Sequence, residues 1–219
     1  MQTATEIQAL IERVYEQRRV ELSNVSWKEY EALLEGIGDL SIFVTYNNGE
    51  CELQARGERS TCEQKLVRRM IDAVAYEIRV SSNGFGSTTW QRPDLAMAIE
   101  ADESYFIQNY RILSEQDYDL TVDPPPDLVV EVEASPSTEK REPIFAALGF
   151  PELWRLKNRR VTFCALQTKR YAPIDKSLAF PSLTCDDFNH YFELWRSGDD
   201  FEAQRAFRQW VRDTLKPRT

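Results

Sequence analysis

The sequence is poor in the residues on which several common active sites depend. It contains one histidine, His190, among 219 residues. A histidine-ligated zinc hydrolase site, a Ser-His-Asp triad and a Cys-His dyad are therefore excluded unless His190 itself supplies them. Neither GxGxxG nor GxxxxGK[ST] occurs, so nothing indicates a loop that binds nucleotide phosphates.

Cysteine pairs and long apolar runs are also missing. The four cysteines are widely spaced, and no CxxC occurs. This spacing argues against a zinc knuckle and supports no disulfide framework, which favours a reduced, cytoplasmic setting. No apolar run is long enough to cross a bilayer. The first residues, MQTATEIQALIERVYEQRR, lack the basic start and apolar core of a secretory signal. We expect a cytoplasmic protein without a membrane partner.

Basic charge is in deficit. The chain has 27 Lys and Arg against 36 Asp and Glu, which gives a net charge of −9. This balance argues against a broad basic surface that coats nucleic acid, but it is compatible with a local basic rim around an acidic centre. The densest basic run, residues 155–160, is typical of a solvated turn and is also the best local candidate for phosphate contacts.

Periodicity and turn residues predict a mixed order of helices and strands. Helices are expected at 4–20, 26–38, 61–79, 138–149, 186–195 and 199–215, with Ser26 and Glu29 forming a capping box and Asp199 a cap. Strands are expected at 40–46, 51–56, 88–92, 101–107, 127–134, 152–156, 161–166 and 169–172, with a turn at 81–86. This order predicts an α/β fold in which helices flank a mixed β-sheet. No repeat or linker divides the chain.

The most informative stretch is the acidic strand that follows three prolines, TVDPPPDLVVEVEASPST at 121–138. Side chains alternate between faces along a strand, so Asp127, Glu131 and Glu133 share one face of an otherwise apolar run. Like charges this close are costly unless a cation neutralises them or one is protonated. A metal site is one interpretation, and a solvent-facing side of an edge strand is the other.

A second strand carries Asp102, on the same face as Ser104 and Phe106. Two carboxylates from adjacent strands, Asp102 and Glu131, together with the carbonyl between Glu131 and Glu133, would make an oxygen site suited to Mg²⁺. This is the D…(D/E)-x-K arrangement of metal-dependent nucleases with its last position changed. Such a metal polarises the scissile phosphate and activates water.

Helix 61–79 adds one acid to the candidates. Glu63 lies three and four residues before Leu66 and Val67, at the N-terminal edge of the buried stripe. It either interacts with the helix dipole as a first-turn acid or contributes to the site.

Several separated motifs resemble one known family. They are WKEYEALLE (27–35), EADESYFI (100–107), PPDLVVEVEASPST (125–138) and IFAALGFPELWR (144–155). They look like the Uma-two family of restriction-endonuclease-like proteins, which belongs to the PD-(D/E)xK nuclease superfamily. The resemblance implies a restriction-endonuclease-like domain over residues 25–195, with an N-terminal helical extension at 1–24 and a C-terminal helix at 196–219.

The resemblance also implies site residues. The family's first metal carboxylate falls on Asp102, although its preceding proline is Ala101 here. A literal Pro93-Asp94 lies upstream, but it is 37 residues before Glu131 and its surroundings do not match the motif. The second carboxylate falls on Glu131.

The lysine position of the motif falls on Glu133, which is a departure. The family's other lysine, four residues before the aromatic position held by Phe145, falls on Arg141, with Lys140 beside it. Either cation could replace the missing lysine in space, while Glu133 could serve as a further metal ligand or bind a water as a base. The superfamily's polar or acidic helix position falls on Glu63.

The sequence thus leads to two functional hypotheses. The first is an endonuclease that uses Mg²⁺, or alternatively Mn²⁺, to cleave DNA, with Asp102, Glu131 and Glu133 as metal ligands. Arg141, Lys140 and Glu63 complete the expected site, and a homodimer is compatible with it. The alternative is an inactive nuclease fold that serves as a binding or assembly module. This alternative is supported by Ala101, Glu133 and the net negative charge.

Overall fold

The computed structural model describes residues 4–55, 57–110, 118–132 and 138–215, except for the side chains of 58–61 and 138–139. Glu133 lies outside the described residues. The chain divides into two compact units, the first made of residues 1–58 and 89–100 and the second of residues 59–88 and 101–219. The domain bounds expected at 24/25 and 195/196 stay predictions.

The first unit is a five-stranded sheet with two helices and a 3₁₀ turn. Its strand order is β1-β3-β2-β6-β5. The elements are α1 (Ala4–Gln17), β1 (Arg19–Leu22), α2 (Trp27–Ile37), β2 (Ile42–Asn47), β3 (Glu50–Ala55), β5 (Thr88–Arg92), η1 (Pro93–Leu95) and β6 (Met97–Ala101).

Local signals account for much of this unit. Ser26 caps α2, and the reciprocal contacts with Glu29 form the predicted capping box. Asn48 and Gly49 take positive φ angles in the tight turn that joins β2 to β3. Tyr30 and Tyr46 meet in the core with ring centroids 4.9 Å apart.

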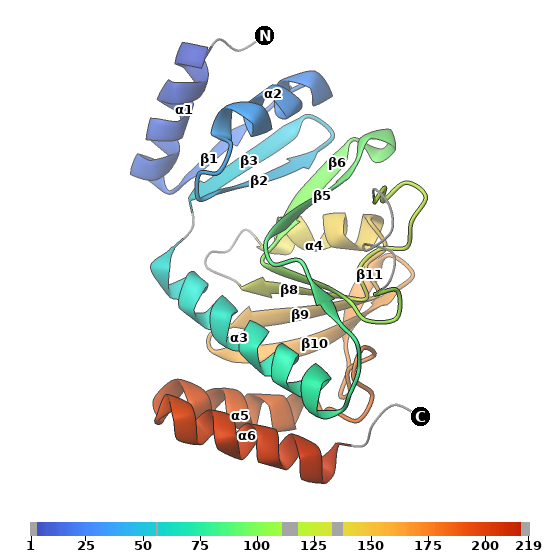
Figure 1. Cartoon of the computed structure of the whole chain (residues 1–219). Helices are drawn as coiled ribbons and strands as arrows, with labels where there is room; N and C mark the ends of the chain where they lie inside the picture. Colours follow the sequence, from blue (N-terminus) through green and yellow to red (C-terminus); the bar gives the residue numbers. More distant parts are fainter. Residues whose placement is uncertain (1–3, 56, 111–117, 133–137, 216–219) are drawn as a thin grey trace. The chain divides into compact units, whose positions relative to one another are not determined.

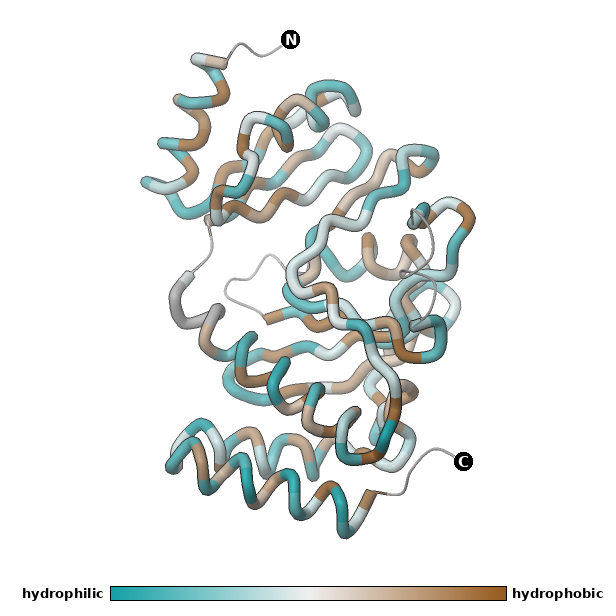
Figure 2. Tube along the Cα trace, viewed as in Figure 1, coloured by the Kyte–Doolittle hydropathy of each residue, from teal (hydrophilic) through white to brown (hydrophobic). Residues whose placement is uncertain are grey.

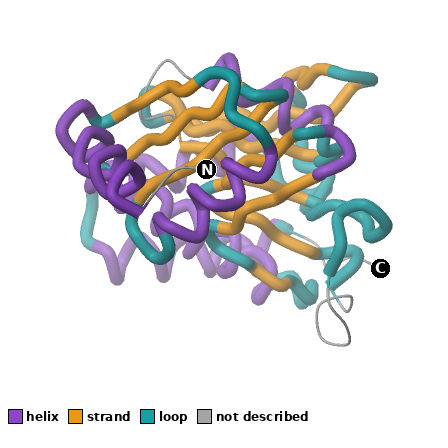
Figure 3. Tube along the Cα trace, turned by 90° about the horizontal axis from the view of Figure 1, so that it is seen from above, coloured by secondary structure: helices purple, strands orange, loops and turns teal. Residues whose placement is uncertain are grey.

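The second unit is a six-stranded mixed sheet flanked by helices. Its strand order is β11-β10-β9-β8-β7-β4. Figure 3 draws the strands of the chain in orange and its helices in purple. The elements are α3 (Glu58–Glu77), β4 (Asn83–Gly84), β7 (Glu103–Phe106), β8 (Leu128–Val132), α4 (Thr138–Ala147), β9 (Glu152–Lys157), β10 (Arg160–Gln167), β11 (Arg170–Pro173), α5 (Cys185–Ser197) and α6 (Asp200–Thr214). β8 and β9 are parallel, with α4 in the connection between them.

Helices cover both faces of this sheet. Leu128, Val130 and Val132 of β8 share a core with apolar residues of α3, α5 and α6, where Trp154 also stacks on Phe163 at 4.0 Å. Figure 1 shows α4 on the side of β8 and β9 away from α5 and α6. Along α6, apolar and polar residues alternate in Figure 2, as expected for a helix with one buried stripe.

The predicted α/β class with a mixed sheet and flanking helices is confirmed, but three details were wrong. The helix expected at 4–20 ends at Gln17, and the strand β1, which was not predicted, begins at Arg19. The strand expected at 101–107 is two strands, β6 and β7, which belong to different sheets and meet at Asp102. The turn expected at 81–86 contains the short strand β4, which pairs with β7. Asp199 caps α6, as predicted.

All four cysteines are free. Among the described residues, no helix combines the length and the apolar character needed to cross a membrane.

Candidate active site

Asp102 and Glu131 face each other across β7 and β8. The two strands are antiparallel, with Glu103 opposite Val130. Extending this register by one residue places Asp102 opposite Glu131. Both are 5% exposed. The alternation of side chains puts them on the face away from the core that Val130 and Val132 share with α3, α5 and α6. The shared face expected from the sequence therefore brings the two acids together.

Asp102 lies where the chain passes from one sheet to the other, and its backbone N–H donates to the Val130 carbonyl at 3.2 Å. Its Oδ2 accepts a hydrogen bond from the N–H of Val132 at 2.7 Å. A carboxylate thus serves as acceptor at the end of β8, because β7 begins only at Glu103.

Asp127 makes the reciprocal contact at the other end of this strand pair. It precedes β8, and its Oδ2 accepts from the N–H groups of Ile107 and Gln108 at 2.6 and 2.8 Å, just after β7 ends. These two donors compensate the burial of this carboxylate without a metal ion. Asp127, one of the three acids that the sequence predicted on one strand face, is therefore accounted for by the fold.

Glu131 is paired with Arg141 of α4. Arg141 Nε lies 2.7 Å from Oε1, and Nη2 donates to Oε2 at 3.0 Å. The side chains are 6% and 5% exposed, so the pair is almost fully removed from water. A two-point contact between guanidinium and carboxylate is among the stronger charged interactions in proteins. The arginine that the resemblance placed at a lysine position thus lies against the second predicted metal carboxylate.

A second ion pair lies beside the first. Arg155 on β9 is the register partner of Glu131 on β8. Its Nη1 lies 2.7 Å from Oε2 of Glu142, the residue that follows Arg141 on α4. Its Nη2 also lies 3.4 Å from Sγ of Cys164. Burial raises the pKa of the Cys164 thiol, and the positive charge of Arg155 opposes that shift.

Two residues that the sequence did not single out support Asp102 from α3 and β7. Gln64 donates from Nε2 to the Asp102 carbonyl at 2.6 Å and to Oε1 of Glu103 at 3.2 Å. Glu103 is 2% exposed, and Arg68 Nη1 lies 3.9 Å from its Oε1. Burial raises the pKa of Glu103 to about 7, against the opposing effects of Arg68 and Gln64.

With this geometry in place, comparison with known families gives a clear result. Residues 27–193 match the Uma2 family, described as "Putative restriction endonuclease". The chain belongs to the Uma2 family. At the level of the family, the chain is therefore grouped with nucleases. No curated protein matches the chain.

The solved structures that are similar to this Uma2 protein include one described as "a putative nuclease belonging to DUF820", from Anabaena variabilis ATCC 29413. The two chains are 15% identical, and the match covers 68% of this chain and 90% of the other, with a TM-score of 0.47.

The predicted site residues of this Uma2 protein divide into two groups. The structure brings Asp102, Glu131 and Arg141 together. Glu63 is half-buried near the start of α3, and Lys140 is exposed on α4. Their part in the site stays a prediction, as does that of Glu133.

The side chains of Asp102 and Glu131 have ligand atoms that suit a small cation with a preference for oxygen. Asp102 and Glu131 offer carboxylate oxygens from neighbouring strands, which is the ligand type that Mg²⁺ prefers. Both oxygens of Glu131 contact Arg141, so a metal bound to the remaining lone pairs of this carboxylate would compete with the guanidinium for its negative charge. Within the described part of the chain, no three His, Cys, Asp or Glu side chains are grouped as a metal cage.

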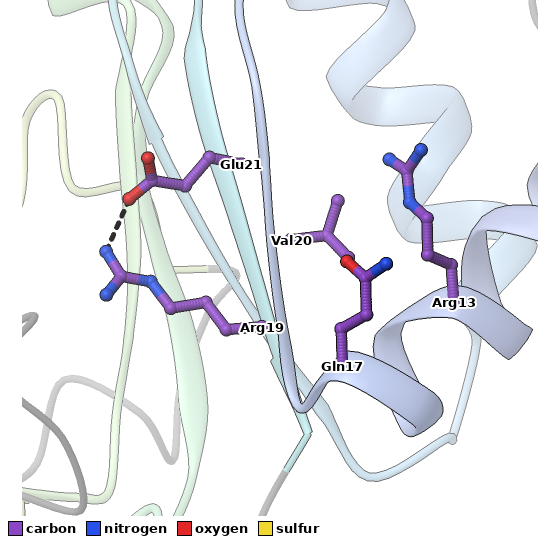
Figure 4. Close-up of a pocket in the computed structure, with 5 residues that line it drawn as sticks. All are labelled: Arg13, Gln17, Arg19, Val20 and Glu21. Atoms are coloured by element: carbon purple, nitrogen blue, oxygen red, sulfur yellow. Dashed lines mark hydrogen bonds and ion pairs between the residues drawn. The ribbon is translucent and has the colours of Figure 1, made fainter.

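The first unit contains a surface cavity of about 500 Å³ that is widely open to solvent. Its lining residues, Arg13, Gln17, Arg19, Val20 and Glu21, are shown in Figure 4. Arg19 points toward Glu21 in this view and is also bonded to Glu52 at 2.5 Å. None of the predicted site residues lines this cavity.

Proposed function

We propose that this Uma2 protein is a Mg²⁺-dependent endonuclease that hydrolyses phosphodiester bonds of DNA. The observation that carries the proposal is the placement of Asp102 opposite Glu131, with Arg141 against Glu131, on one face of the mixed sheet. Two buried carboxylates can hold a divalent cation, and an arginine beside them can stabilise negative charge on a phosphate.

Each residue has a distinct role in this proposal. Asp102 and Glu131 hold the cation, which when bound supplies Lewis-acid polarisation of the phosphate and an acidified water. Arg141, once released from Glu131, stabilises negative charge on the phosphate. It does not act as the general base, because arginine stays protonated throughout the accessible pH range. Glu133 and Lys140 are proposed to assist as a further ligand and a further cation.

A cleavage assay on supercoiled and linear DNA with Mg²⁺ or Mn²⁺ tests the proposal. Asp102→Asn and Glu131→Gln are each expected to abolish cleavage. Asp94→Asn is the matched control, because Asp94 belongs to the literal Pro-Asp pair but is an exposed residue paired with Arg92. Cleavage that survives both site substitutions would contradict the assignment.

One observation favours a second function, that of a non-catalytic binding or assembly module. The two-point contact with Arg141 already neutralises Glu131 without a metal. If this is the working state, calorimetry will detect no Mn²⁺ binding that depends on Asp102. Sedimentation of the full chain would then test for a stable homodimer.

A further inference from the structure

Two ion pairs cross from consecutive residues of α4 to neighbouring strands. Arg141 contacts Glu131 on β8, and Glu142 contacts Arg155 on β9. Glu131 and Arg155 are register partners in the parallel pairing of these strands. The four charges therefore alternate in sign, both along α4 and across the two strands beneath it.

This register gives Arg155 an alternative partner. Neighbouring strands lie about 4.8 Å apart, and register partners point to the same face. A long arginine side chain that starts beside Glu131 is therefore within reach of its carboxylate. In the structure Arg155 turns instead to Glu142 at 2.7 Å and to Cys164 at 3.4 Å.

The two pairs also differ in their exposure to water. Glu131 and Arg141 are 6% and 5% exposed, whereas Glu142 and Arg155 are 23% and 28% exposed. The outer pair is more screened by solvent and easier to separate than the inner one. The partner that holds Arg155 in the outer pair therefore determines how much positive charge lies next to the Glu131 carboxylate.

We propose that Glu142 is a positioning residue that keeps Arg155 away from Glu131 and thereby sets the cation affinity of the Asp102–Glu131 site. The inference rests on the proposed metal-dependent function. With Glu142 in place, Arg155 is paired with Glu142 and the guanidinium in contact with Glu131 is that of Arg141. Without the Glu142 carboxylate, Arg155 turns to Glu131 and adds a second positive charge that opposes metal binding there.

The test measures metal binding directly. Mn²⁺ alone is titrated into the full-length protein, and the free ion is followed by electron paramagnetic resonance. Glu142→Gln is expected to weaken Mn²⁺ binding roughly tenfold, which lies within the usual range of coupling between sites. The double variant Glu142→Gln/Arg155→Gln is expected to return the affinity to about the wild-type value, because the released arginine is then absent.

Asp186→Asn is a matched control. It also removes one carboxylate and releases one arginine, since Asp186 pairs with Arg160 at 2.9 Å, but this pair lies on β10 and α5. Its Mn²⁺ affinity is expected to equal that of the wild type. Near-ultraviolet circular dichroism and thermal unfolding of each variant establish that the fold is intact.

The outcomes separate the two proposals. If the wild type binds Mn²⁺ through Asp102 but Glu142→Gln leaves the affinity unchanged, the role of Glu142 is overturned and the metal site stands. If the double variant binds as weakly as Glu142→Gln, the effect does not pass through Arg155 and the inference is again overturned. Absence of any Mn²⁺ binding that Asp102→Asn removes overturns both.

Discussion

Asp102 Oδ2 accepts a hydrogen bond from the N–H of Val132, one residue beyond Glu131, at 2.7 Å. Asp127 makes the reciprocal contact with Ile107 and Gln108 at the other end of the same strand pair. β7 and β8 are therefore each completed at one end by a carboxylate that precedes the partner strand. Asp102 thus has a structural role, as the acceptor for Val132 N–H, that is separate from the catalytic role proposed for it.

These two roles can be separated by substitution. Asp102→Asn keeps an oxygen acceptor for Val132 N–H and removes the negative charge, so we expect near-wild-type stability with loss of metal binding and cleavage. Asp102→Ala removes the acceptor as well, and an unsatisfied buried N–H costs about 1–3 kcal/mol. Urea unfolding in EDTA compares the two variants. Equal destabilisation would show that the charge, rather than the acceptor, supports the strand end.

The Glu131–Arg141 pair gives a second prediction. Arg141→Gln leaves the Glu131 carboxylate buried without its cation, and we expect a loss of about 3–5 kcal/mol in the free energy of unfolding. The joint replacement Glu131→Leu/Arg141→Met removes both charges and is expected to retain most of the wild-type stability. Urea unfolding at neutral pH measures both. An Arg141→Gln protein as stable as the double variant would contradict this account of the pair.

Acid stability is expected to depend on Glu77 of α3. Although burial acts in the opposite direction, hydrogen bonds from Arg208 and Arg212 of α6 hold the pKa of Glu77 below its ordinary value of 4.5. The charged carboxylate therefore stabilises the fold at pH values above 4.5. This contribution is lost as the pH falls through the lowered folded-state pKa.

The variant Glu77→Gln measures this contribution. At neutral pH we expect it to be less stable than the wild type by about 1–3 kcal/mol, since hydrogen bonds to charged groups are lost. The difference should shrink below pH 4.5 and vanish once Glu77 is protonated in the folded protein. Chemical unfolding at a series of pH values gives the two curves, and a gap that stays constant into the acid range would refute the assignment.

Gln64 is expected to matter more for stability than its neighbours on α3. Gln64→Leu removes the donor to the Asp102 carbonyl and to Glu103, so the unfolding free energy should fall by about 1–3 kcal/mol. Adding Glu103→Gln should recover part of this loss, because a neutral side chain tolerates burial better. Lys65→Gln, at an exposed position of the same helix, is the control. Thermal unfolding distinguishes these variants.

Local signals in the sequence predicted the elements that carry their own caps or a clear period. The capping box at Ser26, the Asp199 cap and the apolar run of β8 are of this kind. The pairing of Asp102 with Glu131 followed from strand alternation together with the family motifs.

Other features depend on partners that the sequence does not name. Residues 101–107 are buried without a break, so no exposed position marks where one strand ends and the next begins. The split at Asp102 is decided by which strands pair with each half. On α3, consecutive residues point about 100° apart. The apolar stripe of this helix did not predict that Gln64 would contact Asp102. Glu103 could have been placed on the core side, since it has the same strand parity as Tyr105 and Ile107.

The reciprocal carboxylate contacts of β7 and β8 bear on how lost activity would appear among related chains. A descendant that no longer cleaved anything would still need an acceptor for Val132 N–H, so an acid or amide at position 102 would persist for folding alone. The Glu131–Arg141 pair is different, because two apolar residues of similar size can replace it at little cost in stability. An acid or amide at position 102 is therefore a poor indicator of catalytic activity. Joint loss of the charges at positions 131 and 141 is a better indicator that a related chain has lost this activity.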